Sequence, residues 1–368
     1  AASWSLTNNF GIKVTMDRGK LYKHPAAEIG VVSTVHPAYI LRNGSAFITW
    51  KRDLQYAVDL LQGRDPKAGL WAPPMWNVLK TREELEALVS RQSRATHIAA
   101  DIETGGSRGA GLHFQRGYIL MLGLTSNLSN GNMVDIIPGD LIWENEDLMH
   151  QLLGNKAKWI WQNGKFDVKF FRHEGIQEAR VDEDTMLLSY TLNENKGHDL
   201  DTIAWDWIGA PKHKNMIDDW FHANRIARKN WDYGLIPKEM LYQYAAYDIS
   251  KTYKMFWPLK EAVEADPHSS KEYNDLLIPG SEFLVQVEMK GLKLDPIRVK
   301  ENDDYILGLQ QEADAAIQEW AIKYTGHQIN IGSPQQLSDL LYSKMKLGPI
   351  GGSTDEDHLI KIQRRFDH

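Results

Sequence analysis

The sequence predicts an α/β protein in which helices cover a mixed sheet, and three observations support this. Apolar runs typical of strands occur at 97–103, 117–125 and 132–137, and Gly and Asn residues between the last two indicate a hairpin. Farther along, helical and strand patterns alternate, as they do where helices lie on the faces of a sheet. The chain has 368 residues, 42% hydrophobic and 25% charged, which is enough for two or three globular domains.

A small αβ appendage is predicted before this central region. Residues 29–35 have the pattern of a strand, His36 and Pro37 indicate a turn, and residues from about 48 to 61 follow a helical pattern. The Gly- and Pro-rich stretch 63–74 is typical of a linker.

Most of the remaining elements are predicted to be helices. Thr81 and Glu84 have the spacing of a capping box, in which each side chain binds a free backbone N–H at a helix start. Helical patterns cover 81–92, 146–153, the residues after Gly164, 182–192, 199–209, 238–257 and most of 276–368, with one strand at 158–163. We expect three domains, at 1–70, 71–265 and 266–368.

Composition excludes several classes of protein. No apolar run is long enough to span a membrane, and the first residues lack the pattern of a signal peptide. The absence of cysteine excludes disulfides, thiolate zinc sites and iron–sulfur clusters, and it is compatible with the reducing cytoplasm, where we expect the protein to lie. A net charge of -7 argues against a surface that is basic throughout, but it leaves a local basic groove open.

Two carboxylates at the end of an apolar strand are the first functional signal. Asp101 and Glu103 are two apart, so in an extended strand they point to the same side. Two carboxylates this close cannot both stay ionised at low cost without a cation. A single Asp-x-Glu is nevertheless expected about once or twice by chance in a chain of this composition.

Two further stretches strengthen the signal. Asn163 and Asp167 are four apart at a strand-to-helix junction, and Tyr244 and Asp248 are four apart inside a predicted helix, so each pair shares one helical face. Asp248 has apolar and aromatic neighbours, where an unpaired charge would be costly.

The order Asp-x-Glu, Asn-x-x-x-Asp, Tyr-x-x-x-Asp resembles the three exonuclease motifs of the DEDD nucleases, tyrosine subclass. The whole central segment is similar to the 3′–5′ proofreading exonuclease domain of family A DNA polymerases, and "DIETGG", "NGKFD", "DTMLLSYTLN" and "YAAYD" occur in the order of that family. The resemblance implies an RNase H-like (DnaQ-like) fold with a mixed five-stranded sheet.

The resemblance also implies a site for two metal ions. Asp101, Glu103 and Asp248 would hold the first ion, Asp101 would bridge to the second, and Asp167 would act mainly through water. Carboxylate oxygens suit Mg²⁺ or Mn²⁺ better than zinc. Two such ions compensate charge on the attacking and leaving oxygens of phosphodiester hydrolysis.

Other residues in or near the motifs are expected to position the substrate or to support the fold. By resemblance, Tyr244 would orient the attacking water, and Thr104 and Asn163 would contact the terminal nucleotide. Phe166 is interpreted as core packing rather than a platform for a base. Asp184 has the sequence context of a helix N-cap.

The flanking segments resemble pieces of other domains. Residues 31–61 are similar to the C-terminal end of uracil-DNA glycosylases that use an iron–sulfur cluster, with the loop from His36 to Arg42 in the place of their DNA-contacting loop. The water-activating motif and the cysteines of that family are absent, so no glycosylase activity is expected, and a small appendage with a chance His-Pro turn remains the alternative. Residues 276–350 resemble the start of a family A polymerase domain, without palm or fingers, so polymerisation is not expected either.

The leading hypothesis is a metal-dependent 3′–5′ exodeoxyribonuclease that acts on single-stranded or frayed 3′ ends of DNA and releases nucleoside monophosphates. The chain would be part of a longer polymerase, whose missing portion is its partner; if a phage encodes it, the location is the host cytoplasm. Two alternatives stay open. One is an exoribonuclease of the RNase D type, because sequence does not display contacts to a 2′-OH. The other is a non-catalytic DNA-binding scaffold.

Overall fold

The computed structural model describes residues 21–26, 29–42, 46–64, 69–213, 215–347 and 353–366. The chain divides into two compact units, residues 1–290 and 291–368. The domain boundaries expected after residues 70 and 265 stay a prediction. No helix among the described residues is both long and apolar enough to cross a lipid bilayer.

The first described residues form a short antiparallel ribbon and two helices. These are β1 (Leu21–Lys23), β2 (Gly30–Val32), α3 (Pro37–Arg42) and α4 (Ala46–Leu61). The predicted strand is present but short. His36 does not simply turn the chain, because Pro37 begins α3, a position that suits the fixed φ of proline. Residues 43–45 lie outside the described residues, and the likeness of residues 31–61 to a glycosylase stays a prediction.

The centre of the first unit is a mixed sheet with the strand order β3-β6-β5-β4-β7-β8. Its strands are β3 (Met75–Val78), β4 (His97–Gly105), β5 (Tyr118–Ser126), β6 (Met133–Pro138), β7 (Lys158–Trp161) and β8 (Glu183–Asp184). β4, β5 and β6 pair antiparallel, and the other pairs are parallel. The mixed sheet is confirmed, but it has six strands rather than five. β8 consists of two acidic residues that pair through their backbone, so it has no apolar strand pattern.

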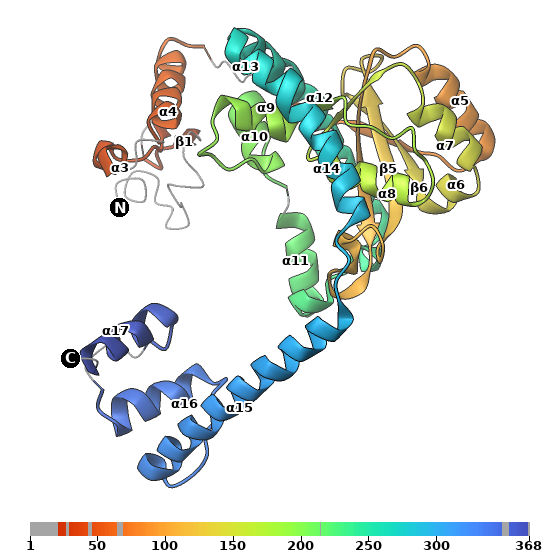
Figure 1. Cartoon of the computed structure of the whole chain (residues 1–368). Helices are drawn as coiled ribbons and strands as arrows, with labels where there is room; N and C mark the ends of the chain where they lie inside the picture. Colours follow the sequence, from red (N-terminus) through yellow and green to blue (C-terminus); the bar gives the residue numbers. More distant parts are fainter. Residues whose placement is uncertain are drawn as a thin grey trace. The chain divides into compact units, whose positions relative to one another are not determined.

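Helices cover both faces of this sheet, and Figure 1 shows α5 and α7 on one side and α9, α10 and α12 on the other. The α-helices that follow α4 in this unit are α5 (Arg82–Gln92), α6 (Gly139–Trp143), α7 (Glu146–Leu153), α8 (Lys165–His173), α9 (Thr185–Leu192), α10 (Leu200–Ile208), α11 (Asn215–Ala223), α12 (Lys238–Glu264), α13 (Pro267–Glu272) and α14 (Ile278–Lys290). Trp159 and Trp161 of β7 pack into the core on one face, and Ile160 packs into the core on the other. After Lys158, β7 is apolar because it is buried on both faces.

The long helix α12 approaches the sheet closely at Gly123 in β5. A Cβ atom at Gly123 would lie 2.2 Å from Cδ1 of Ile249, a residue of α12 that is 0% exposed. Gly123 pairs with Asp101 on β4, and Ile249 directly follows Asp248. The missing side chain therefore lets two elements that carry carboxylates lie close together.

The second unit is helical, as predicted. It contains α15 (Pro296–Thr325), α16 (Pro334–Ser338), a π-helical turn (Asp339–Lys344) and α17 (Glu356–Phe366). The Ser-Pro pair starts α16 as the sequence suggests, because the Ser333 hydroxyl accepts a hydrogen bond from the Gln336 N–H at 3.4 Å.

Candidate active site

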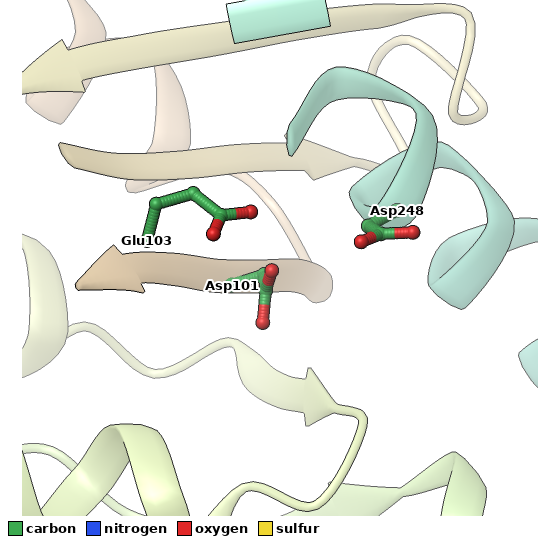
Figure 2. Close-up of side chains that lie close together, drawn as sticks. All are labelled: Asp101, Glu103 and Asp248. Carbon is green, nitrogen blue, oxygen red and sulfur yellow. The ribbon is translucent and has the colours of Figure 1, made fainter. Parts of the chain in front are cut away.

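Three carboxylates meet at the junction of β4 and α12. Figure 2 shows Asp101 and Glu103 on one strand and Asp248 on the neighbouring helix. One carboxylate oxygen from each residue lies within 4.8 Å of the others. Glu103 is 6% exposed and Asp248 is 9% exposed, so the group is largely withdrawn from water. The structure thus brings together the strand and helix carboxylates that the motifs single out.

Asp167 joins this group from the first turn of α8. It is 1% exposed, and its Oδ1 accepts a hydrogen bond from the Ile102 N–H at 3.0 Å. Asp184 caps α9, as predicted, and it also accepts hydrogen bonds from the N–H groups of Asn163 at 3.1 Å and Gly164 at 2.9 Å. One carboxylate therefore fixes the start of α8 as well as that of α9, and through α8 the position of Asp167.

The buried carboxylates repel one another. Burial, together with the charges of the neighbouring acids, raises the pKa values of Asp101 and Glu103 well above their usual range. Burial also raises the pKa of Asp167 to about 8, although the Ile102 N–H works against this rise. Among the described residues, no lysine or arginine forms an ion pair with these three carboxylates. A set of oxygen donors in this state fits a divalent cation such as Mg²⁺ or Mn²⁺.

The free energy of unfolding of the metal-free protein is expected to fall as the pH rises from about 4 to about 8. In this range Asp167 keeps its proton in the folded protein and loses it in the unfolded chain, so stability is present below the unfolded pKa and lost toward the folded one. One such group gives a slope of about 1.4 kcal/mol per pH unit. Urea titrations in chelator at several pH values measure the slope, and Asp167→Asn should make it shallower by the share of this one group. An unchanged slope in that variant would contradict the assignment.

His213 lies beside the metal-site candidates and was missed by the sequence analysis. Its Nε2 is 3.0 Å from Asp248 Oδ1, although the two atoms are not aligned for a hydrogen bond. Its Nδ1 is 3.2 Å from Asp201 Oδ1, which in turn accepts from Lys251 Nζ at 2.6 Å. Burial lowers the pKa of His213, but its contacts with Asp201 and Asp248 outweigh this and raise it to about 9. A cationic His213 would stabilise the ionised Asp248 carboxylate by charge attraction.

Asp101, Glu103 and Asp248 line a pocket of about 360 Å³, a size common for ligand sites. Thr104, Phe166 and Tyr244 line it, together with Trp231. Phe166 also packs against the hydrophobic core, in line with its interpretation as core packing, and it is partly exposed to the pocket. Asn163 is exposed and is not part of the pocket wall.

Two loops that the sequence analysis left unassigned complete the pocket. Their 3₁₀ turns are η1 (Ser107–Leu112) and η2 (Arg228–Asn230). The signal for the second loop is a run of basic and aromatic residues, "RKNWDY", between α11 and α12. Such a run has no secondary-structure period, and only the fold places it over the carboxylates.

One family model and several known proteins are similar in sequence to this chain. A family model described as 3′–5′ exonuclease matches residues 77–264, just over half of the chain. DNA polymerase I of Borreliella burgdorferi is 25% identical over 273 residues, which cover 73% of this chain and 28% of that protein. The DNA polymerase of Escherichia phage T5 is 26% identical over 320 residues, which cover 81% of this chain and 36% of that protein.

A solved structure has a similar fold. The POL domain of Pol1 from M. smegmatis, in complex with DNA primer-template and dNTP, superposes with a TM-score of 0.52 at 16% identity and covers 80% of this chain and 46% of that one. At this identity the likeness concerns the fold alone. The chain spans about a third or less of the two curated relatives above.

Proposed function

Because the chain belongs to the 3′–5′ exonuclease family, we propose that it removes nucleotides from the 3′ end of DNA by metal-dependent hydrolysis. The observation that carries this proposal is the group of buried carboxylates from β4, α8 and α12, which have no basic partner other than His213 among the described residues. The products would be nucleoside 5′-monophosphates. The physiological setting would be proofreading in a longer family A polymerase.

Asp101, Glu103 and Asp248 would hold one ion, and Asp101 and Asp167 would face the second, the latter mainly through water. Two Mg²⁺ or Mn²⁺ ions, when bound, supply positive charge next to the attacking and leaving oxygens. The protein's own contribution is to hold the carboxylates in place: β4 fixes two of them, and the N–H of Ile102 fixes the third. Thr104 lines the pocket and would contact the terminal nucleotide there. Asn163, just before α8, would contact the same nucleotide from outside the pocket wall.

Tyr244 would orient the attacking water. It is 8% exposed, lines the pocket one helical turn before Asp248, and packs against the His213 ring at 4.9 Å. Burial, followed by the charges of Asp248 and Glu103, raises its pKa, so its hydroxyl stays protonated and can donate a hydrogen bond.

Tyr244→Phe is expected to lower kcat by about 10- to 100-fold, because the ring remains and only the hydroxyl is lost. Binding of Mn²⁺ should be unchanged, which isothermal titration calorimetry can measure. Tyr247→Phe is the matched control, since Tyr247 also packs on His213 but does not line the pocket. Loss of Mn²⁺ binding in Tyr244→Phe would show that the residue supports the metal site instead.

DNA is favoured over RNA as the substrate by the polymerase-like second unit and by the curated relatives, which are DNA polymerases. A non-catalytic scaffold is disfavoured because it would gain nothing from three buried carboxylates, those of Glu103, Asp167 and Asp248, each of which costs free energy to bury.

The deciding experiment digests a 5′-labelled single-stranded DNA and the matching RNA, in Mg²⁺ or Mn²⁺, with Asp101→Ala beside the unaltered protein. A ladder that shortens from the 3′ end on DNA, and that disappears in chelator and in the variant, supports the proposal. Faster digestion of RNA would favour the exoribonuclease alternative. If neither nucleic acid is digested in either metal, but the protein still binds the single-stranded DNA, the scaffold is favoured.

A further inference from the structure

Three cationic side chains lie at the mouth of the catalytic pocket. Arg108 belongs to η1, and Arg228 and Lys229 belong to η2. Together with Gly109 and Asn230 they line a second hollow, which shares Gly109 and Arg228 with the catalytic pocket. All three side chains are exposed. We call Arg108, Arg228 and Lys229 the basic rim.

The charges of the basic rim are not neutralised within the part of the chain that the structure describes. No carboxylate there forms an ion pair with any of the three, and Arg228 only lies over the Trp231 ring at 5.8 Å. Lysines on α8 behave differently, since Lys165 and Lys169 both pair with Glu288. The rim is therefore available to an anion from outside the protein.

Asp232 holds the two loops together without neutralising the rim. Its Oδ1 accepts hydrogen bonds from the N–H groups of Gly106, at the start of η1, and Gly234, both at 2.9 Å. Arg108 has a positive φ of 54°, an uncommon conformation for a residue with a side chain. The loop thus places a cation, in a costly backbone conformation, at the edge of an acidic pocket.

We propose that the basic rim binds backbone phosphates of the substrate strand on the 5′ side of the bond that is cut. This inference rests on the proposed function. A strand whose end lies at the carboxylates must leave the pocket through its mouth, and a chain of net charge -7 attracts a polyanion only where its cations gather. Contacts with phosphates add affinity and direction without sequence preference.

The test compares the double variant Arg108→Gln/Lys229→Gln with a matched control, Arg94→Gln/Lys156→Gln. The two rim residues line the outer hollow but not the catalytic pocket. The control cations are exposed and lie two or three residues before β4 and β7, which run parallel. They therefore lie near the end of the sheet where β4 begins, and Glu103 lies near the other end of that strand. Both variants remove two positive charges and keep side chains of similar length.

Binding is measured by fluorescence anisotropy in chelator, with labelled oligothymidylate of about ten nucleotides, within the usual size of single-strand sites. The slope of log affinity against log salt concentration is expected to become shallower by about 1.4 in the rim variant, or about 0.7 per lost phosphate contact. The control variant should keep the slope of the unaltered protein. Equal slopes in all three proteins would overturn the proposal.

Activity on two substrates distinguishes a role of the basic rim in strand binding from a role in hydrolysis. The p-nitrophenyl ester of thymidine 5′-monophosphate has a scissile phosphate but no phosphate upstream of it. For the rim variant, kcat/KM should fall about tenfold on the oligonucleotide and stay within about twofold on the ester. An equal loss on both substrates would overturn the proposal. If the unaltered protein cleaves neither substrate, the proposed function fails, and the salt slope still decides the role of the rim.

Discussion

Asp101→Ala is expected to lower the rate of 3′–5′ hydrolysis by about a thousandfold or more, the largest effect of any single substitution in the site. Asp101 contributes to the group with Glu103 and Asp248, and it is the residue proposed to face both ions. Its loss would remove a ligand from each ion at once. Single-turnover digestion of labelled DNA measures the rate, and titration calorimetry with Mn²⁺ measures the loss of metal binding.

The same substitution should not unfold the protein. In the absence of metal, Asp101 is repelled by Asp167, Glu103 and Asp248, so removing it relieves repulsion. The metal-free variant is therefore expected to be at least as stable as the unaltered protein. Glu146→Ala, which removes an exposed carboxylate from α7, is the control for the loss of one charge. A marked drop in the melting temperature of Asp101→Ala would mean that the carboxylate supports the fold rather than a metal site.

Lys251→Met is expected to have the largest effect on stability, about 3 kcal/mol in the free energy of unfolding. Lys251 is 0% exposed, and its ammonium donates to Asp201 Oδ1 at 2.6 Å and to the Pro211 carbonyl at 2.8 Å. Without it, the buried Asp201 carboxylate keeps His213 but loses its ion pair with Lys251. Because His213 also contacts Asp248, activity should fall together with stability.

Urea denaturation of a double-mutant cycle tests this account. The double variant Lys251→Met/Asp201→Asn should lose much less free energy of unfolding than the two single variants together, because the second change removes the carboxylate that was left without its lysine. Lys156→Met, at an exposed position, should leave the free energy of unfolding nearly unchanged. Additive effects in the cycle would show that the two residues do not depend on each other.

The carboxylates of the site could be predicted from sequence because their spacing follows local geometry. Asp101 and Glu103 share a side of β4 through the two-residue period of a strand, and Tyr244 and Asp248 share a face of α12 through the period of a helix. The N-cap role of Asp184 was predictable for the same reason, since the residues that it caps directly follow it. Each of these relations lies within one element.

What sequence could not predict depends on contacts between distant segments. His213 lies in an irregular loop, and its contact with Asp248 exists only after α12 packs on the sheet. The second pair of hydrogen bonds to Asp184, from the start of α8, joins residues about twenty positions apart. β8 was missed because it consists of two acidic residues and has no apolar strand pattern. No periodic pattern records such contacts.

Gly123 gives this active site a weakness that its motifs do not reveal. It binds no ligand, yet a Cβ there would force the buried Ile249 to turn, or would push α12 and its Asp248 away from the strand that carries Asp101. Two-metal hydrolysis tolerates little change in the separation of the ions, which is about 4 Å. In a homologue with all four carboxylates and a bulkier residue at this position, Ile249 is therefore expected to repack, and activity depends on whether Asp248 keeps its place beside Asp101. A glycine on a neighbouring strand is thus part of what positions the acids.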